Sequence, residues 1–398
     1  MKRLACIALS VFLAVPAWSA AKKITVAELK DMLNTMHQQK KGDADVATAL
    51  KQVMLSEQLT RPMMNSLVED VPGQLSTEQI YVLEARSATL QPPASDIPAT
   101  PAPDAPAQQA LLTKAASYAS GTWGQLPEMT ATKTTLRFQD NVEALADASG
   151  MHGAAQDVSV GSGFVNPYNY VHYINASDAT IGLGKGGEKL PQDKTQWGRN
   201  KMIALQDPDP DLGTVFAEAR EFGGMKWDRW ESINGKPAAV FSYDVPKKKS
   251  KMGVHVCCFP DIDQTGVMTL TGQMGTGAPG GAAGAGGGAK GNLQTNTNWN
   301  PYKNNQVGYR GQFFIDPDSG IVVRMITQAE QKPSDMVHQV DTRIDYGPVT
   351  VGGKSLVLPV KSVVITEVVP NGEAGAGGFS TRCTLFTSEY KNYELAGK

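Results

Sequence analysis

Residues 310–328 have the sequence RGQFFIDPDSGIVVRMITQ. Two runs rich in aromatic and β-branched residues, Arg310–Ile315 and Ile321–Gln328, flank the segment Asp316-Pro317-Asp318-Ser319-Gly320. Such runs favour strands, and Asp, Pro, Ser and Gly favour tight turns. The stretch therefore predicts an antiparallel β-hairpin.

The segment that follows the hairpin alternates with the period of a strand. Val340, Thr342, Ile344 and Tyr346 share one side of Val337–Tyr346, and the other side carries Gln339, Asp341, Arg343 and Asp345. This pattern predicts an antiparallel sheet with one face on the core and the other in water. Further strands are expected at Thr132–Gln139, Val165–Ile174, Ala238–Val245, Lys251–Phe259, Ser355–Leu358, Lys361–Val368 and Ser380–Tyr393, with Pro246–Ser250 as a basic turn.

One amphipathic helix interrupts these strands. Asp211 is the expected N-cap of a helix that runs to Phe222 and ends at Gly223-Gly224. Its apolar stripe is expected to pack on the concave side of the sheet. The predicted fold class is α+β, with a curved antiparallel sheet, or half-barrel, that cups this helix and follows a small all-α unit.

The chain of 398 residues divides by composition. Residues 1–20 have the basic start, short apolar run and small residues of a secretory signal peptide, with no later stretch of membrane-spanning length. Residues 24–91 predict a helical domain, 92–108 a Pro/Ala-rich linker, and 109–398 the β half-barrel domain. Within that domain, residues 270–306 are Gly- and Asn-rich and predict a disordered insertion.

Local signals define the helices of the first domain. Thr25 and Glu28 form a capping box, and Thr60 with Pro62 begins a later helix. Ser76 is the expected cap of the last helix, in the run Ser76–Gln79. Four short helices can enclose a modest core at this length.

Charge and cysteine content limit the classes of function. The net charge is −2, and without Lys2 and Arg3 of the signal it is −4, from 35 basic and 39 acidic residues. This balance gives no electrostatic reason to expect a nucleic-acid partner. The mature chain would keep Cys257, Cys258 and Cys383, an odd number that leaves a disulfide to Cys383, a vicinal disulfide and free thiols all open.

Two segments match the sequence patterns of metal sites in part. Asp207, Asp209, Asp211 and Glu218 have the spacing of a calcium loop, but Leu212 stands where that loop needs glycine. His255 and Cys257 share one side of a strand without nearby ligands to complete a zinc site. We therefore predict no metal and no cofactor.

Four segments resemble a group of secreted proteins of acidobacteria: residues 227–231, 239–246, 309–320 and 344–349. That resemblance covers most of Leu111–Tyr393. The hairpin and the strands after it are also similar to the periplasmic lipoprotein-carrier and sigma-factor-regulator superfamily. This second resemblance implies a half-barrel around helices, with a hydrophobic hollow for lipid or peptide. It transfers no functional residue, because those carriers use a lined hollow and no residue motif.

The sequence thus predicts a periplasmic or secreted, non-enzymatic protein that binds a lipid, an acyl chain or a hydrophobic peptide. The expected lining of its hollow is Tyr170, Val215, Phe216, Phe222, Trp230, Phe241, Tyr243 and Phe313. A second hypothesis is a structural or interaction module whose helical unit contacts an envelope protein. A third is a hydrolase or thiol enzyme that uses Cys257 or scattered carboxylates.

Overall fold

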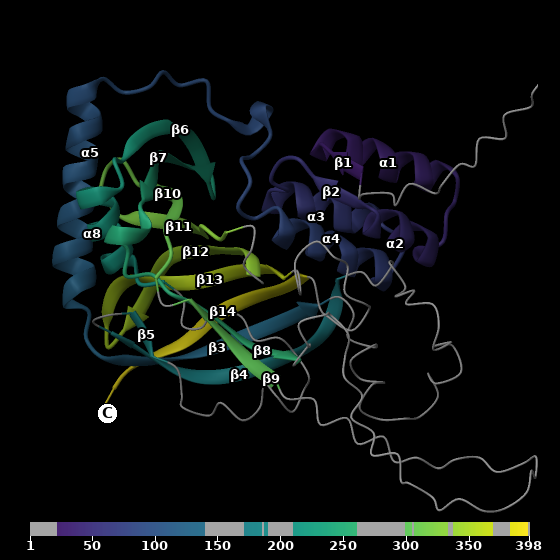
Figure 1. The fold of residues 1–398 in the computed structure, drawn as a ribbon. Coiled ribbons are helices and arrows are strands. Elements are labelled where there is room, and N and C mark those ends of the chain that lie inside the picture. Colours follow the sequence, from purple (N-terminus) through teal and green to yellow (C-terminus); the bar gives the residue numbers. More distant parts are fainter. Residues whose placement is uncertain are drawn as a thin grey trace, which may run out of the picture.

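The structure is a computed structural model that describes residues 22–139, 171–184, 187–189, 210–260, 299–304, 306–332, 337–368 and 383–396. For residues 255–260, 299–304 and 368 it describes the backbone alone. In these ranges the protein combines a helical unit with a large antiparallel sheet, as Figure 1 shows. The predicted α+β class with an antiparallel sheet is confirmed.

The helical unit, residues 22–90, has its own hydrophobic core. Its elements are β1 (Lys22–Ile24), α1 (Val26–Gln38), α2 (Asp43–Lys51), β2 (Val53–Leu55), α3 (Arg61–Asp70) and α4 (Gln74–Arg86). Leu29, Leu67 and Ile80 are fully buried in that core. The predicted capping box is confirmed, because Thr25 Oγ1 accepts from the Glu28 N–H while the Glu28 carboxylate accepts from the Thr25 N–H at 2.8 Å. The parallel pairing of β1 with β2 was not predicted.

The predicted cap of the last helix is wrong. Helix α4 begins at Gln74 with Gly73 at the N-cap, so Ser76 lies inside its first turn. The capping group is the carboxylate of Asp43 on α2, which accepts from the N–H groups of Leu75 at 3.0 Å and Ser76 at 2.9 Å. The Ser76 hydroxyl and these N–H groups hold the pKa of Asp43 below its usual range. A cap supplied from another helix leaves no local signal.

The connection between the two parts ends in a helix that docks on the predicted hairpin. It contains η1 (Ala94–Asp96), α5 (Ala105–Ser117), η2 (Tyr118–Thr122) and η3 (Trp123–Gln125). The carboxylate of Asp104 accepts from the Ala107 N–H at 2.9 Å and caps α5. Further along α5, Lys114 Nζ donates to the carbonyl oxygens of Pro317 at 3.1 Å and Asp318 at 3.2 Å.

The large sheet has ten strands, all paired antiparallel. From one edge to the other they are β5 (Gly187–Lys189), β4 (His172–Gly184), β3 (Met129–Gln139), β14 (Cys383–Leu395), β13 (Lys354–Val368), β12 (Val337–Val351), β11 (Val322–Ala329), β10 (Tyr309–Ile315), β7 (Lys236–Val245) and β6 (Lys226–Ile233). A separate ribbon pairs β8 (Val254–Pro260) with β9 (Trp299–Asn304).

The predicted hairpin is confirmed as β10 and β11, but the neighbourhood of β7 differs from expectation. Strand β7 lies between β10 and β6 and does not pair with β8, although the chain joins them through η5 (Lys247–Lys249). Strand β6 was not predicted. The sequence feature that could have predicted it is the dipeptide Asn234-Gly235, which forms the turn between β6 and β7 with φ of 51° and 77°.

Two predicted boundaries also differ from the structure. Residues 299–304 form β9, so the predicted insertion 270–306 extends too far, and its part up to residue 298 lies outside the described residues. The expected strand Val165–Ile174 lies largely outside them as well, and β4 begins at His172 and continues to Gly184.

Helices cover both faces of the sheet. Helix α8 (Leu212–Phe222) packs on the face that carries Phe313 and Met325, which we call the α8 face. Its predicted cap is confirmed, since the Asp211 carboxylate accepts from the Thr214 N–H at 2.8 Å. Helix α4 packs on the opposite face, the α4 face, where Val82 and Ala85 join one buried cluster with Val363, Ile365 and Leu385.

The expectation of one solvated face is therefore wrong in this part of the sheet. Alternation along β12 is as predicted, but its charged side faces α4 and is buried: Arg343 is 9% exposed and Asp341 is 4% exposed. The position of α4, which a long connection separates from the strands in sequence, cannot be read from strand periodicity. Among the described residues, no helix combines the length and apolarity needed to cross a membrane.

Candidate functional site

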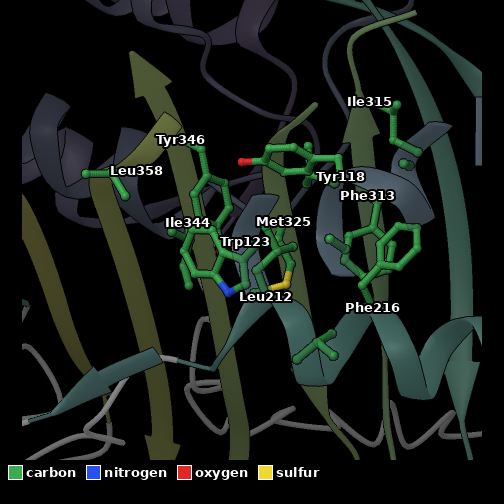
Figure 2. Close-up of a cluster of buried hydrophobic side chains, with 14 of the residues drawn as sticks. Tyr118, Trp123, Leu212, Phe216, Phe313, Ile315, Met325, Ile344, Tyr346 and Leu358 are labelled. Carbon is green, nitrogen blue, oxygen red and sulfur yellow. The ribbon is translucent and has the colours of Figure 1, made fainter. Parts of the chain in front are cut away.

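Most of the predicted lining residues meet on the α8 face. Val215 and Phe216 of α8 lie in one buried cluster with Phe241, Tyr243 and Phe313 of the sheet. The ring of Phe313 is 4.9 Å from that of Phe216 and stacks on Tyr243 at 4.6 Å, between centroids. The sequence therefore identified a true convergence of apolar side chains, part of which Figure 2 shows.

The other predicted residues lie at the margin of this cluster or beyond the described chain. Phe222 ends α8 and is half-buried, with Lys249 Nζ 4.8 Å from its ring centroid. Trp230 of β6 is half-buried and packs against the edge of the cluster. Tyr170 lies outside the described residues.

The cluster is packed as a hydrophobic core. Residues outside the predicted lining fill it from η3, β12 and β13, notably Trp123, Tyr346 and Leu358 (Figure 2). The Trp123 ring meets the Tyr346 ring edge-on at 5.5 Å. A hollow beside the first turn of α8 measures about 10 Å³, which is at most the space of a single water molecule. A guest of several hundred Å³ would have to displace α8.

A row of threonines crosses the middle of the α8 face. Thr327 lies opposite Thr342, and Thr366 lies opposite Thr384, so the row spans β11 to β14. Each residue is at most 1% exposed. Within the described chain, their hydroxyl groups have no hydrogen-bond partner. A buried hydroxyl without a partner costs stability, so this row is a weak point of the sheet.

A buried ion pair holds the edge strand β5 to the same face. Lys133 Nζ lies 2.9 Å and 3.1 Å from the two carboxylate oxygens of Glu188, and the Tyr390 hydroxyl donates to Glu188 at 3.2 Å. Both charged side chains are less than 10% exposed. Because both carboxylate oxygens of Glu188 bind Lys133 Nζ, we interpret this pair as a structural contact that holds β5 and not as a reactive amine.

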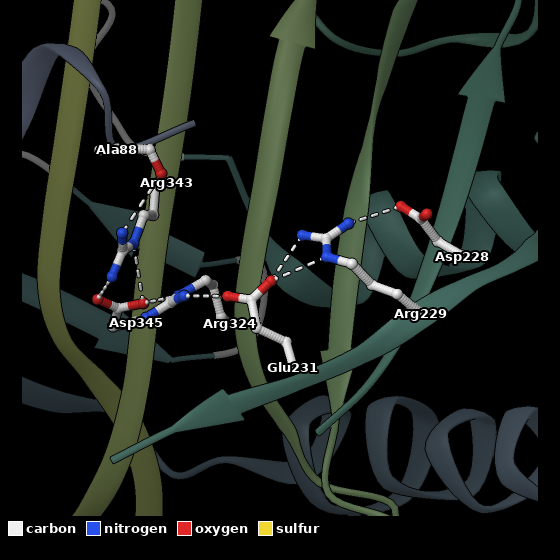
Figure 3. Close-up of polar contacts among 7 residues, drawn as sticks. All are labelled: Ala88, Asp228, Arg229, Glu231, Arg324, Arg343 and Asp345. Atoms are coloured by element: carbon white, nitrogen blue, oxygen red, sulfur yellow. Dashed lines mark hydrogen bonds and ion pairs between the residues drawn. The ribbon is translucent and has the colours of Figure 1, made fainter. Parts of the chain in front are cut away.

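The α4 face carries a chain of alternating charges. Arg229 of β6 contacts Asp228 at 2.7 Å and Glu231 at 2.6 Å, and Glu231 reaches Arg324 of β11 at 3.3 Å. Arg324 in turn contacts Asp345 of β12 at 2.5 Å. Figure 3 shows the side chains in one line across the strands.

The chain of charges continues to the helical unit. Arg343 contacts Asp345 at 2.9 Å and donates to the carbonyl oxygen of Ala88, just beyond α4, at 3.3 Å (Figure 3). One strand further on, Lys361 lies 3.2 Å from Glu84 of α4. The network contains three arginines and three carboxylates, so their formal charges sum to zero. They are Arg229, Arg324, Arg343, Asp228, Glu231 and Asp345 (Figure 3).

Asp345 is the central acceptor of this network. Its burial favours the protonated acid, but Arg324 and Arg343 outweigh that effect and hold the pKa of Asp345 well below its usual range. Both Arg324 and Arg229 also lie over the ring of Phe314, at 5.2 Å and 5.8 Å from its centroid. These contacts describe a structural network of buried ion pairs, with no nucleophile among its members.

The residues of the two partial metal patterns either have structural roles or lie outside the described residues. Asp211 caps α8, and the Glu218 carboxylate accepts from the Tyr309 hydroxyl at 2.9 Å and the Lys251 N–H at 3.1 Å. The side chains of His255 and Cys257 are outside the description. Across the described ranges, no three His, Cys, Asp or Glu side chains are grouped to hold a metal ion.

A hollow of ligand size lies on the helical unit. It is a surface groove of about 470 Å³ formed by the C-terminal half of α1, the loop that follows it, α2, and the end of α3 with the two residues after it. Its lining is Leu33, His37, Gln38, Lys40, Lys41, Val46, Asp70, Val71 and Pro72. Apolar side chains thus stand beside two lysines, a histidine and one carboxylate.

Comparisons of the chain with protein-family models, curated proteins and solved structures found no match.

We expect Asp345→Asn to lower the free energy of unfolding by about 3 kcal/mol at pH 7, because it removes the carboxylate that the buried Arg324 and Arg343 share. A carboxylate with a lowered folded-state pKa stabilises above its unfolded pKa, and the effect declines as pH falls toward the folded value. The difference from wild type should therefore shrink below about pH 4. Urea unfolding at pH 7 and pH 3 measures both values.

The matched control is Glu389→Gln, which removes a pair with Lys391 whose side chains are 50% and 60% exposed. It should cost less than about 1 kcal/mol. Equal losses in the two variants would contradict the structural role of Asp345.

Thr342→Val should stabilise the protein by about 1 kcal/mol, because it replaces an unpaired buried hydroxyl by a methyl group of the same shape. Thr135→Val is the control, since the Thr135 hydroxyl lies 2.9 Å from that of Ser388 and is also buried. That variant should lose about 1 kcal/mol. Urea unfolding compares them, and a loss for Thr342→Val would show that this hydroxyl has a partner in solution.

Proposed function

We propose that this chain is a non-catalytic binding protein of the periplasm or the cell exterior that contacts a protein partner through its helical unit. The sheet then serves as the scaffold that presents this unit. The observation that carries the proposal is the position of the ligand-sized hollow, on α1 and α2 and away from the packed α8 face. Its volume of about 470 Å³ is within the usual range of binding pockets.

The chemistry of the groove suggests its occupant. Lys40 and Lys41 are exposed, and His37 stands beside them, against the single carboxylate of Asp70. Val71 and Pro72 are the accessible apolar side chains of the lining, whereas Leu33 and Val46 are buried. The occupant we propose is an extended acidic segment of the partner that also carries apolar side chains.

A photo-crosslinking residue at the exposed position Gln38, in the full chain in a bacterial periplasm, tests the proposal. We expect a crosslinked peptide with acidic and apolar residues, identified by mass spectrometry. Lys40→Glu with Lys41→Glu should reduce the adduct at least about fivefold by charge repulsion. The matched control is Lys247→Glu with Lys248→Glu in the exposed η5 turn, which should leave the adduct unchanged. Equal adducts in both variants, or none in wild type, would reject the groove.

A second candidate function is the binding of a lipid, an acyl chain or a hydrophobic peptide on the α8 face. The convergence of Phe216, Phe241, Tyr243 and Phe313 favours it. This function assumes that the sheet curves around α8 as a half-barrel and that a guest takes the place of α8. The glycines that end α8, with φ of 56° at Gly224, would allow that movement.

Native mass spectrometry and lipid extraction of protein purified from a periplasm test the second candidate. Phe313→Ala should raise the bound fraction of a guest because it opens space on the α8 face. Phe314→Ala is the control, since Phe314 is equally buried but on the α4 face. Both truncations should cost about 3–5 kcal/mol, so a difference in bound mass reports on the face. Identical extracts from the two variants, or no bound mass at all, would exclude this function.

A further inference from the structure

The Pro-rich connection crosses the sheet at its open edge. It leaves α4 on one face and reaches α5 on the other, passing strand β6 on the way (Figure 1). At this crossing the indole N–H of Trp230 donates to the carbonyl oxygen of Pro101 at 2.9 Å. The segment predicted as a linker is thus hydrogen-bonded to the sheet.

Trp230 stands next to a second indole, that of Trp227. Trp227 and Trp230 of β6 have ring centroids 5.0 Å apart at an interplanar angle of 70°. The ring of Trp227 in turn meets Phe241 edge-on at 5.5 Å, which anchors the pair to the core of the α8 face. Both indoles remain half-buried, so they present aromatic area and one hydrogen-bond donor at the surface.

The bound segment has the composition of a polyproline ligand. Residues 98–103 read PATPAP, with prolines at 98, 101 and 103. The residues on either side are extended, with φ and ψ of −80° and 120° at Ile97 and −66° and 166° at Asp104. Prolines preset this conformation and leave carbonyl oxygens as the available polar groups. Aromatic grooves recognise such segments through ring contacts and through donors to those carbonyls.

We propose that Trp227 and Trp230 form a binding site for proline-rich extended segments, which in this structure holds residues 98–103 of the same chain through the Pro101 carbonyl oxygen. A short tether gives its ligand an effective concentration near millimolar, so even a weak site stays filled from within the chain. The site is independent of the groove on α1 and α2. It fixes the path of the connection past β6.

The test uses the full chain with Pro98→Gly and Pro101→Gly, which removes the preset conformation of the ligand and leaves the site intact. The indole ¹H–¹⁵N resonance of Trp230, assigned with Trp230→Phe, should move from its wild-type position when the segment is released. A synthetic peptide of residues 96–104, DIPATPAPD, should then return it in a saturable manner. The wild-type chain, with its site filled, should not respond to the same peptide concentrations.

Two controls define the outcome. The peptide DIAATAAAD, with every proline replaced by alanine, should bind the glycine variant at least about fivefold more weakly. Trp230→Phe in the glycine variant keeps a ring but loses the donor, and should weaken peptide binding about fivefold, followed through the Trp227 resonance. The proposal is overturned if the glycine substitutions leave the Trp230 resonance in place, if the peptide does not restore it, or if both peptides bind equally.

Discussion

Asp345 accepts ion pairs from arginines on two neighbouring strands, and this contact allows the sheet to bury a face that its sequence makes charged. Arg324 and Arg343 are each less than 10% exposed. Removed from water without a carboxylate, each guanidinium would cost several kcal/mol, of the order of the whole stability of a domain. With Asp345 between them and Glu231 beyond, the charges balance, and α4 can cover this part of the sheet.

The network does not itself drive the helical unit onto the sheet. A buried ion pair returns about what its desolvation costs, so its net contribution is near zero. The driving contact is the apolar cluster beside it, in which Val82, Val363 and Leu385 are each at most 4% exposed. Side chains of this size contribute about 1.5–3 kcal/mol each when fully buried. Apolar contact therefore supplies the affinity, and the arginines fix the position by requiring the Ala88 carbonyl and the Glu84 carboxylate as partners.

The predictions that succeeded depend on neighbours in sequence. The β10–β11 turn, the Asp211 cap and the alternation along β12 are each encoded within about a dozen residues, and all three are confirmed. Those that failed depend on distant partners. Asp43 caps α4 from α2, and α4 covers a face that periodicity alone marks as solvated.

The candidate site divides in the same way. The apolar periods of α8 and the strands identified Phe216, Phe241 and Phe313, which do converge. Whether these side chains enclose a hollow depends on which other residues pack among them. Trp123 does so from the short helix η3, which no hydrophobic periodicity in the sequence predicts. The groove on the helical unit had no signal at all, because it forms where the ends of separate helices meet.

The position of the helical unit also explains why its connection is rich in proline. With α4 on one face and α5 on the other, the chain must pass an edge of the sheet, and it passes β6. An ordinary extended segment at that place could pair with β6 as a further strand, since an edge strand offers unpaired N–H and C=O groups. Prolines at 98, 101 and 103 remove three of the six backbone N–H donors of this stretch and so disfavour such pairing. The bulge between Trp227 and Arg229 disturbs the same edge from the other side. The composition that marks a spacer in the sequence thus keeps the sheet at its ten strands, while the Trp230 indole still holds the segment in place.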